Sequence, residues 1–443
     1  MAKTSKKGNV YLWSKDSCSG FFNPSSDLLN RNYIVKEFVL TMKEVLVLGA
    51  GYAGLKTVRN LQKESGDFHI TLVDMNDYHY EATELHEVAA GSQPKDKITY
   101  PIRDVLNDKK VTFLQDEVTK IDPANKLVSV KKNGSLHYDY VVVALGFCSE
   151  TFGIKGAQEN ALQMVDIDTS EAIHQHIIAM MKKYKETKDK NYLKLLICGA
   201  GFTGIELAGA FVDERKKYAQ IAGVDESEIE IICVEAATRI LPMFDDEMAQ
   251  YGVNLIKKLG VNLMTGCMIK EIRPGQVVYA KGKDDPEEHV VEAATIVWTT
   301  GVSGSPVIGE SGFEQRRGRV MVKPNLTAPD YDDVYIIGDV SALMDSASNR
   351  PFPTTAQIAT RMGAHVATNL AHQLKGEAIE DFDFKSLGTV ASVGNTHAFG
   401  VVGTKKIKGY PASFVKKAIM NKSLVDIGGL KELLAKGRFD LYH

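Results

Sequence analysis

A glycine-rich hexapeptide that directly follows a short apolar run occurs twice in this chain. In the first copy Val45–Leu48 precedes Gly49–Gly54, and a helix-like pattern of apolar residues comes next. A second apolar run, Ile70–Val73, then ends on Asp74. This order of strand, tight turn, helix and strand, within about thirty residues, predicts a βαβ unit.

The same order returns 150 residues later in the chain. Leu193–Cys198 precedes Gly199–Gly204, and the apolar run Ile229–Val234 ends on Glu235. The stretch before Glu235 is longer than the usual spacing of about 20 residues, which indicates an insertion around Ile221–Glu228. Two copies of one βαβ unit predict an α/β protein with two Rossmann-like domains.

Each hexapeptide has the G-x-G-x-x-G spacing of a dinucleotide-binding turn. The first glycine makes the turn, the second lets the backbone approach a pyrophosphate, and the third lets helix and strand pack closely. Amide groups at the helix N-terminus then hold the phosphates. The glycines are Gly49, Gly51 and Gly54 in the first copy, and Gly199, Gly201 and Gly204 in the second.

An acidic residue ends the second strand of both units. A carboxylate at this position accepts hydrogen bonds from ribose hydroxyl groups and repels the 2′-phosphate of NADP. Asp74 and Glu235 therefore favour dinucleotides without that phosphate. Arg239 lies four residues after Glu235 and is a nearby cation that could weaken this preference.

Bulk composition narrows the class of protein. A chain of 443 residues is longer than one hydrophobic core usually organises, so we expect two or three domains. The net charge of −3 gives no electrostatic reason to bind nucleic acid. Scattered cysteines without a C-x-x-C pair argue against a disulfide scaffold, a metal site or a redox-active dithiol, and suit a reducing compartment. They are Cys18, Cys148, Cys198, Cys233 and Cys267.

No apolar run reaches the roughly 20 residues of a spanning helix, so we expect any membrane contact to be peripheral. Residues 1–41 contain clusters of Lys, Ser and Asn and no glycine fingerprint. They lack the apolar region and cleavage site of a signal peptide, and Arg31 is their only arginine, unlike a mitochondrial transit peptide. We expect a poorly ordered extension, with Met42 opening the folded protein.

Three further motifs resemble those of the flavoprotein disulfide-reductase and NADH dehydrogenase superfamily. Tyr335–Asp339 resembles its strand-Gly-Asp motif, whose aspartate binds the ribityl chain of FAD. Ala144-Leu-Gly146 and Thr300-Gly301 resemble its two turns, one for each dinucleotide domain. The resemblance implies FAD at the first fingerprint and NADH at the second. The implied FAD contacts are Gly49, Gly51, Gly54, Asp74, Ala144, Gly146, Gly338, Asp339 and Ala356, and the implied NADH contacts are Gly199, Gly201, Gly204, Glu235 and Gly301.

The order of these motifs implies that the FAD domain is interrupted by the NADH domain. We expect the FAD domain to comprise residues 42–155 and 305–400, and the NADH domain residues 156–304. Residues 401–443 then form a separate C-terminal segment.

The cysteine positions separate the branches of this superfamily. Disulfide reductases need a cysteine pair close after the first βαβ unit, and no cysteine lies between Asp74 and Phe147, which excludes them. Sulfide:quinone oxidoreductases also need paired cysteines near the flavin. Cys148 lies beside one turn, but Cys198 and Cys233 lie in apolar strands and are expected to be buried. The sulfide branch therefore stays as an alternative.

Several segments resemble the type II NADH:quinone oxidoreductases, and the resemblance extends over residues 42–440. In that family an Ala-Gln-x-Ala-x-Gln segment lines the quinone site beside the flavin. Ala356, Gln357 and Ala359 match it, whereas Arg361 replaces the final glutamine. The resemblance thus implies a quinone site at Gln357, Ala359 and Arg361. The matching segments are Asp77–Glu87, Leu145–Gly153, Gly199–Glu206 and Pro353–Ala359.

Glu206 lies two residues after the last glycine of the second fingerprint. An acidic residue early in a helix is favoured by the helix dipole in any case. In the family the matching glutamate faces the nicotinamide and quinone region and assists proton delivery. Because quinone reduction takes up two protons, we expect Glu206 and Gln357 to act in catalysis. His79, His86 and Glu87 are expected to be packing and hydrogen-bonding residues.

The C-terminal segment is strongly basic although the whole chain is acidic. Between Thr404 and Arg438 nine basic residues stand against Asp426 and Glu432, a local charge of +7. Apolar residues recur at helical spacing, which predicts two short amphipathic helices with lysines on their polar faces. Such helices are typical of anchors on anionic lipid. The alternatives are a helix packed on the core with a solvated basic face, or a dimer contact.

These expectations combine into a non-proton-pumping NADH:quinone oxidoreductase that is peripheral to the cytoplasmic face of the cell membrane. Hydride passes from NADH to FAD, and two electrons then reach a membrane quinone, with menaquinone as the expected acceptor. Alternatives are a soluble NADH oxidase or diaphorase, a sulfide:quinone oxidoreductase, and a non-enzymatic flavoprotein that binds NADH. We expect NADH, quinone and anionic lipid as partners, no nucleic acid, and a homodimer as a further option.

Overall fold

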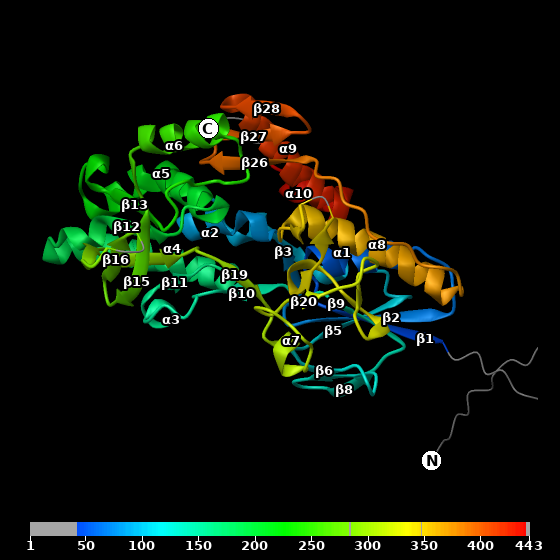
Figure 1. The fold of residues 1–443 in the computed structure, drawn as a ribbon. Coiled ribbons are helices and arrows are strands. Elements are labelled where there is room, and N and C mark those ends of the chain that lie inside the picture. Colours follow the sequence, from blue (N-terminus) through cyan, green and yellow to red (C-terminus); the bar gives the residue numbers. More distant parts are fainter. Residues whose placement is uncertain (1–41, 283–284, 347, 440–443) are drawn as a thin grey trace, which may run out of the picture. The chain divides into compact units, whose positions relative to one another are not determined.

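The computed structural model describes residues 42–282, 285–346 and 348–439. The expected N-terminal extension, residues 1–41, lies outside the described residues. From Met42 onward the described chain forms two parallel β-sheets with helices, several small antiparallel sheets and a C-terminal pair of helices (Figure 1).

The first sheet has six strands in the order β21-β22-β9-β1-β2-β5. All neighbours are parallel except the edge pair β21 and β22. Strand β22 lies beside β9, with Val334 opposite Val141, although 193 residues separate these two positions. The chain therefore completes its first sheet only after building the second one. The strands are β1 Lys43–Leu48, β2 Phe68–Asp74, β5 Val111–Gln115, β9 Tyr140–Val143, β21 Thr327–Ala328 and β22 Tyr331–Ile336.

The second sheet has five parallel strands in the order β11-β18-β12-β13-β14. Its central strand β12 is an almost continuous apolar run, and Leu195, Leu196 and Ile197 are fully buried. This is typical of parallel strands, which are covered on both faces. The strands are β11 Leu162–Gln163, β12 Lys194–Cys198, β13 Glu230–Glu235, β14 Val261–Thr265 and β18 Thr295–Trp298.

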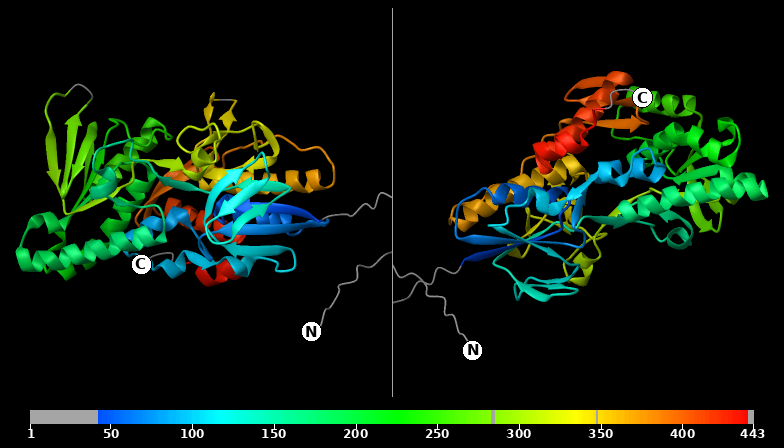
Figure 2. Two further views of the ribbon diagram at one scale, coloured as in Figure 1. Left: turned by 90° about the horizontal axis from the view of Figure 1, so that it is seen from below. Right: turned by 180° about the vertical axis from the view of Figure 1, so that it is seen from behind.

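Helices connect and cover the strands (Figures 1 and 2). Their bounds are α1 Tyr52–Leu61, α2 Leu85–Ala90, α3 Ala157–Asn160, α4 Ile167–Thr187, α5 Phe202–Ala222, α6 Asp246–Lys258, α7 Val307–Glu310, α8 Ala356–Leu374, α9 Tyr410–Ile427 and α10 Leu430–Lys436. The two predicted βαβ units are confirmed as β1-α1-β2 and β12-α5-β13. The additional residues of the second unit are not a loop insertion around Ile221–Glu228, because α5 has 21 residues and α1 has 10. The insertion prediction was wrong since a longer helix adds residues without lengthening the connection.

Small antiparallel sheets complete the described chain. They comprise β3 Tyr78–Tyr80 with β4 Thr99–Pro101; β6 Val118–Asp122, β7 Leu127–Val130 and β8 Gly134–His137; β10 Phe147–Ser149 with β19 Val302–Gly304; β15 Cys267–Arg273, β16 Gln276–Lys281 and β17 His289–Glu292; β24 Met344–Asp345 with β25 Arg350–Pro351; and β26 Gly388–Val393, β27 His397–Val402 and β28 Lys405–Lys408. A short parallel pair joins β20 Val320–Met321 to β23 Ser341–Ala342.

No described helix is long and apolar enough to cross a bilayer.

Helix α8 packs along α1, so a segment from the second half of the chain covers the first fingerprint helix (Figure 2). Gly363 lies at the closest approach, where an added Cβ would clash with the carbonyl oxygen of Ala53. The hydroxyl group of Thr57 also donates to the carbonyl oxygen of Gly363 at 3.1 Å. The absence of a side chain at Gly363 therefore sets the distance between the two helices.

We predict that Gly363→Ala destabilises the protein by about 1–3 kcal/mol, because overpacking a close helix contact forces the backbones apart. The measurement is the free energy of unfolding in urea. Thr368→Ala on the exposed side of α8 is the matched control and is expected to stay within about 0.5 kcal/mol of the parent protein. Equal stability of the two variants would contradict this account of the contact.

Candidate functional site

The first glycine turn is shaped by close backbone contacts. Gly49 has a φ of +97°, and a Cβ at this position would meet the carbonyl oxygen of Ala144 at the end of β9. A Cβ on Gly54 would meet the carbonyl oxygen of Gly49. By contrast, a Cβ on Gly51 would have no atom within 4 Å. The turn thus packs tightly on its inner side and has open space at its middle glycine, where a pyrophosphate needs to approach.

Asp74 holds this turn from the neighbouring strand. Its carboxylate accepts hydrogen bonds from the backbone amide groups of Ala50 at 2.6 Å and Asn76 at 2.8 Å. Burial raises the pKa of Asp74, and these two hydrogen bonds oppose the rise. The carboxylate therefore stabilises the turn.

The second glycine turn repeats this construction. Gly199 has a φ of +105° and packs against Thr300, and a Cβ on Gly204 would meet the carbonyl oxygen of Gly199. The carboxylate of Glu235 accepts from the amide groups of Ala200 and Ala237, both at 2.8 Å. Helices α1 and α5 begin after glycines of matching extended conformation, with no side-chain cap on either. Their first amide groups are thus available to an anion.

Arg239 is turned to other partners near the second acidic residue. Its guanidinium group forms an ion pair with Asp246 at 2.8 Å and donates to the carbonyl oxygen of Phe244 at 3.0 Å. Gly301, the last residue of the second turn motif, packs beside the ring of Phe152, and its carbonyl oxygen accepts from Glu150 at 3.1 Å.

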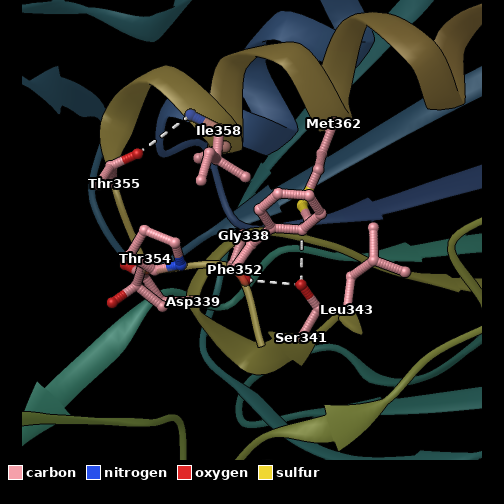
Figure 3. Close-up of a pocket in the computed structure, with 11 residues that line it drawn as sticks. Gly338, Asp339, Ser341, Leu343, Phe352, Thr354, Thr355, Ile358 and Met362 are labelled. Atoms are coloured by element: carbon pink, nitrogen blue, oxygen red, sulfur yellow. Dashed lines mark hydrogen bonds between the residues drawn. The ribbon is translucent and has the colours of Figure 1, made fainter. Parts of the chain in front are cut away.

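A pocket lies between the end of β22 and the start of α8 (Figure 3). Gly338 has a φ of +70°, and Asp339 follows it into the pocket. The carboxylate of Asp339 makes no hydrogen bond to any residue in the described part of the chain, and burial raises its pKa while Arg319 opposes the rise. The pocket-lining residues are Gly338, Asp339, Ser341, Leu343, Phe352, Pro353, Thr354, Thr355, Ile358, Ala359 and Met362.

This pocket fits the flavin cofactor that the sequence motifs imply. Asp339 is an acceptor without a hydrogen-bond partner among the described residues, so it suits the hydroxyl groups of a ribityl chain. Helix α8 begins above it with Thr355 as its cap, whose hydroxyl oxygen accepts from the amide group of Ile358 at 3.2 Å. The remaining amide groups of this first turn are available to electronegative ligand atoms.

The expected quinone residues lie on the first two turns of α8. The side-chain oxygen of Gln357 accepts from the backbone amide of Leu387 at 3.0 Å. Ala359 is buried and lines the pocket, whereas Arg361 is exposed and does not line it. Arg361 forms no ion pair with any described residue. The structure thus brings Gly338, Asp339 and Ala359 into one pocket and leaves Arg361 outside its lining.

Glu206 is buried at the junction of three segments. Its Oε1 atom accepts from the amide and hydroxyl groups of Ser392 on β26, at 3.2 and 3.0 Å, and from Nζ of Lys416 on α9 at 2.7 Å. Burial acts to raise the pKa of Glu206, but Lys416, His86 and the hydrogen bonds outweigh burial and leave the pKa below its ordinary value. The residue is therefore charged at neutral pH.

Sequence reasoning missed Lys416 as the partner of Glu206. The 210 residues between them give no local signal of contact, and Lys416 was counted only as part of the basic tail. His79 and His86 are buried, and Glu87 is partly buried. His79 contacts the carbonyl oxygen of Ala50 at 2.8 Å, which places it beside the first fingerprint.

The predicted polarity of the C-terminal helices was wrong for α9. Lys417 is buried in this helix and Lys416 faces Glu206, while Phe414 and Ile419 are among its exposed residues. The lysines turn inward because carboxylates elsewhere in the fold accept them. Other tail cations are also matched, with contacts from Lys406 to Asp245 and Glu247, Lys408 to Glu247, Lys431 to Asp104, Lys422 to Asp426, and Arg438 to Glu84 and Glu87.

The described cysteines are all free thiols. Sγ of Cys148 is 3.2 Å from the hydroxyl group of Ser303 on the neighbouring strand β19. Cys198 and Cys233 lie fully buried in adjacent strands, as expected, and burial raises the pKa of both thiols. Within residues 42–282, 285–346 and 348–439 no cysteine pair lies beside the pocket at Asp339, which argues against the sulfide alternative.

The chain is similar to known proteins in family, sequence and fold. The family described as pyridine nucleotide-disulphide oxidoreductase matches residues 43–363. The type II NADH:quinone oxidoreductase of Staphylococcus saprophyticus is 42% identical over 402 residues, which cover 90% of this chain and 99% of that protein. The protein of the same name from a strain of Staphylococcus epidermidis is 43% identical, again over 90% of this chain and 99% of its own length.

Solved structures at low sequence identity share the fold. NDH2 from Plasmodium falciparum in complex with NADH has a TM-score of 0.80 at 17% identity, covering 91% of this chain and 99% of that one. The sulfide:quinone oxidoreductase of Aquifex aeolicus has a TM-score of 0.72 at 19% identity, covering 87% and 92%. At these identities the likeness concerns the fold alone.

We predict that Lys416→Met destabilises the protein by about 3–5 kcal/mol, because it leaves the buried carboxylate of Glu206 without a cation. The double variant Glu206→Gln/Lys416→Met is expected to recover most of this loss. Lys431→Met, which removes an exposed ion pair with Asp104, is the control and should cost no more than about 1 kcal/mol. Unfolding in urea measures all three, and equal losses from the two single variants would count against the buried pair.

Proposed function

Because this chain belongs to the type II NADH:quinone oxidoreductase family, we propose that its two glycine turns, the pocket at Asp339 and its C-terminal helices form one route from NADH to a membrane quinone. The enzyme is an FAD-dependent NADH dehydrogenase whose electron acceptor is a quinone. The fold is the α/β arrangement of the pyridine nucleotide-disulphide oxidoreductases. We further propose roles for individual residues, the identity of the quinone and contact with a membrane surface.

We assign FAD to the first fingerprint. The observation that carries this assignment is that β1, β9 and β22 are neighbours and run parallel, so their carboxyl ends meet at one edge of the sheet. Ligands of such sheets bind in the crevice outside the carboxyl ends of the strands. The assigned residues are Gly49, Gly51 and Gly54 after β1, Asp74 at the end of β2, Ala144 and Gly146 after β9, Gly338 and Asp339 after β22, and Ala356 at the start of α8.

When bound, FAD supplies the ring system that accepts hydride, and the protein supplies orientation and access. Asp74 accepts from the ribose hydroxyl groups of the adenosine half, and Asp339 accepts from the ribityl hydroxyl groups. Residues 42–155 and 305–400 form the FAD domain in this assignment, in agreement with the strands of the first sheet.

NADH is assigned to the second fingerprint, in a domain of residues 156–304. The amide groups at the start of α5 hold its pyrophosphate, and Gly199, Gly201, Gly204 and Gly301 shape the site. Glu235 accepts from the ribose hydroxyl groups and repels a 2′-phosphate. Arg239 is engaged by Asp246 and Phe244, so it does not offset this repulsion, and NADH is preferred to NADPH.

The quinone head group is proposed to lie beside Gln357 and Ala359 at the start of α8. Gln357 offers amide hydrogens to a quinone carbonyl oxygen, since its side-chain oxygen is already bonded to Leu387. Arg361 lies one turn further along the same helix and adds a permanent positive charge at the exposed rim. Quinone reduction takes up two protons, and we assign Glu206 a part in their delivery.

The C-terminal segment, residues 401–443, is proposed to rest on the cytoplasmic face of the membrane as a peripheral contact. The support is a group of exposed apolar side chains rather than the lysines that the sequence suggested. Phe414 is 53% exposed and Leu434 is 76% exposed. The group comprises Tyr410, Phe414, Ile419, Val425, Leu430, Leu434 and Phe439. Lipid covers these side chains in this proposal, and a second copy of the chain is the alternative cover.

We predict that Phe414→Ser/Leu434→Ser weakens binding to lipid vesicles, by roughly tenfold for each side chain removed from the bilayer, because each burial is worth about 1.5–3 kcal/mol. Co-sedimentation with vesicles of neutral and anionic lipid measures the effect. Lys422→Gln is the control and should change binding little. The apolar contact would be contradicted if salt abolished vesicle binding and Phe414→Ser/Leu434→Ser bound vesicles as tightly as the parent protein. A dimer that the apolar variant dissociates would favour the second copy.

The function is tested by following NADH oxidation with a menaquinone analogue, a ubiquinone analogue or oxygen as acceptor, with and without anionic liposomes. We expect quinone turnover far above the oxygen rate and higher turnover on liposomes. Asp339→Ala is expected to lose FAD, as seen in the absorbance of the purified protein, with Asp332→Ala at an exposed position as the control. Turnover with oxygen alone would indicate a soluble oxidase, and slow turnover with every acceptor would indicate a non-enzymatic NADH-binding protein.

A further inference from the structure

Four side chains from different segments meet behind the first glycine turn, outside the pocket at Asp339. His79 lies on β3, Glu81 follows that strand, Tyr52 lies on α1 and Ser423 lies on α9. His79 and Glu81 are each only 2% exposed. Two of these residues are linked to the first glycine turn. His79 contacts Ala50 in the turn, and Tyr52 lies in the turn as the first residue of α1.

The hydrogen bond between His79 and Ala50 defines the tautomer of the ring. Nδ1 lies 2.8 Å from the carbonyl oxygen of Ala50, and a carbonyl oxygen can only accept, so Nδ1 carries the hydrogen. Burial lowers the pKa of His79 to about 4, and the ring is neutral at physiological pH. Nε2 is then a bare acceptor, and it has no hydrogen-bond partner among the described residues.

The two carboxylate oxygen atoms of Glu81 have different surroundings. Its Oε2 atom accepts from the hydroxyl groups of Tyr52 at 2.8 Å and Ser423 at 3.0 Å. Its Oε1 atom has no partner in the described chain and lies 4.0 Å from Nε2 of His79. Two buried acceptors that face each other without a hydrogen are unfavourable. A hydrogen on Oε1 would make one of them a donor.

We propose that Glu81 carries a proton on Oε1 and donates it to Nε2 of His79, and thereby holds the FAD-binding turn through the bond from His79 to Ala50. Glu81 is a positioning residue in this proposal, since it acts on the cofactor through His79. A side-chain rotation that shortens the 4.0 Å separation by about 1 Å completes an O–H···N hydrogen bond. The inference rests on the assignment of FAD to the first fingerprint.

The surroundings favour the protonated acid. Burial raises the pKa of Glu81 to about 7, although the hydrogen bonds from Tyr52 and Ser423 oppose the rise. No cation of the described chain contributes to this balance. Tyr100 on β4 and Glu84 on the next turn also face Glu81. Burial raises the pKa of both, and Glu81 adds to the rise. Nearby cations are engaged elsewhere, with Arg438 on Glu84, Arg59 on the carbonyl oxygens of Val425 and Ile427, and Lys416 on Glu206.

Ionisation of Glu81 would release the turn. Once the proton has left to solvent, Oε1 and Nε2 repel each other as two acceptors. The ring relieves this by moving its hydrogen to Nε2, which then donates to Glu81. Nδ1 becomes an acceptor facing the carbonyl oxygen of Ala50, so the bond to the FAD turn is lost. FAD binding therefore weakens as the pH rises through about 7 and is strongest below it.

The test is the dissociation constant of FAD from the purified holoenzyme between pH 6.0 and 8.5, measured by the fluorescence of released FAD. In the parent protein we expect this constant to rise roughly threefold to tenfold across the range, the equivalent of one hydrogen bond. Glu81→Gln keeps a donor toward His79 and an acceptor toward Tyr52 and Ser423, but cannot ionise. Its dissociation constant is expected to stay low and to vary by less than about twofold across the range.

Two controls make the outcome specific. Glu64→Gln changes a half-exposed carboxylate on the surface and should retain the pH dependence of the parent protein. Glu81→Ala removes donor and acceptor together and should weaken FAD binding at every pH. ¹⁵N NMR of labelled histidine in the parent protein reports the tautomer directly, with hydrogen on Nδ1 of His79 at pH 6 and on Nε2 at pH 8.5.

Hydrogen on Nε2 of His79 at pH 6, or the same pH dependence in Glu81→Gln as in the parent protein, would overturn the proposal. Its failure differs from a failure of the proposed function. FAD that binds independently of pH in an enzyme with normal quinone turnover refutes the role of Glu81 alone. An enzyme that retains FAD with the expected pH dependence but lacks quinone turnover refutes the proposed function alone.

Discussion

A carboxylate at the end of a strand holds the neighbouring glycine turn in both halves of this enzyme. Asp74 accepts the amide hydrogen of Ala50, and Glu235 accepts that of Ala200. Each acidic side chain orients the turn that follows the preceding strand of its sheet. The parallel sheets, the open first turns of α1 and α5, and the pocket at Asp339 all depend on these turns keeping their shape.

The C-terminal segment is built into the catalytic body through buried polar contacts. Lys416 pairs with Glu206, Ser423 donates to Glu81, and Arg438 binds two carboxylates near α2. Its exposed side chains include apolar residues that suit a lipid surface. The proposed membrane contact and both proposed nucleotide sites therefore involve the same helix, α9.

Local patterns in the sequence were sufficient for the two βαβ units, because strand, glycine turn and helix are neighbours along the chain. The same holds for Asp339, which directly follows a strand and a glycine of positive φ. The helices of the tail were also expected, but not their polarity. A lysine count over residues 404–438 treats each cation as solvated, whereas Asp245, Glu247 and Asp104 accept several of them from distant positions. The roles of Arg361 and of the domain boundaries remain predictions.

The sequence by itself determined the α/β fold class and the two glycine turns, and it predicted acidic residues that favour NADH, since each follows from short-range spacing and residue chemistry. Only the tertiary structure decided which side chains meet across the chain. The Glu206–Lys416 pair joins residues 210 positions apart, and Glu81 meets Ser423 across 342 positions. No periodicity encodes such contacts, because they arise where two separately folded segments pack and one buried charge or acceptor requires another.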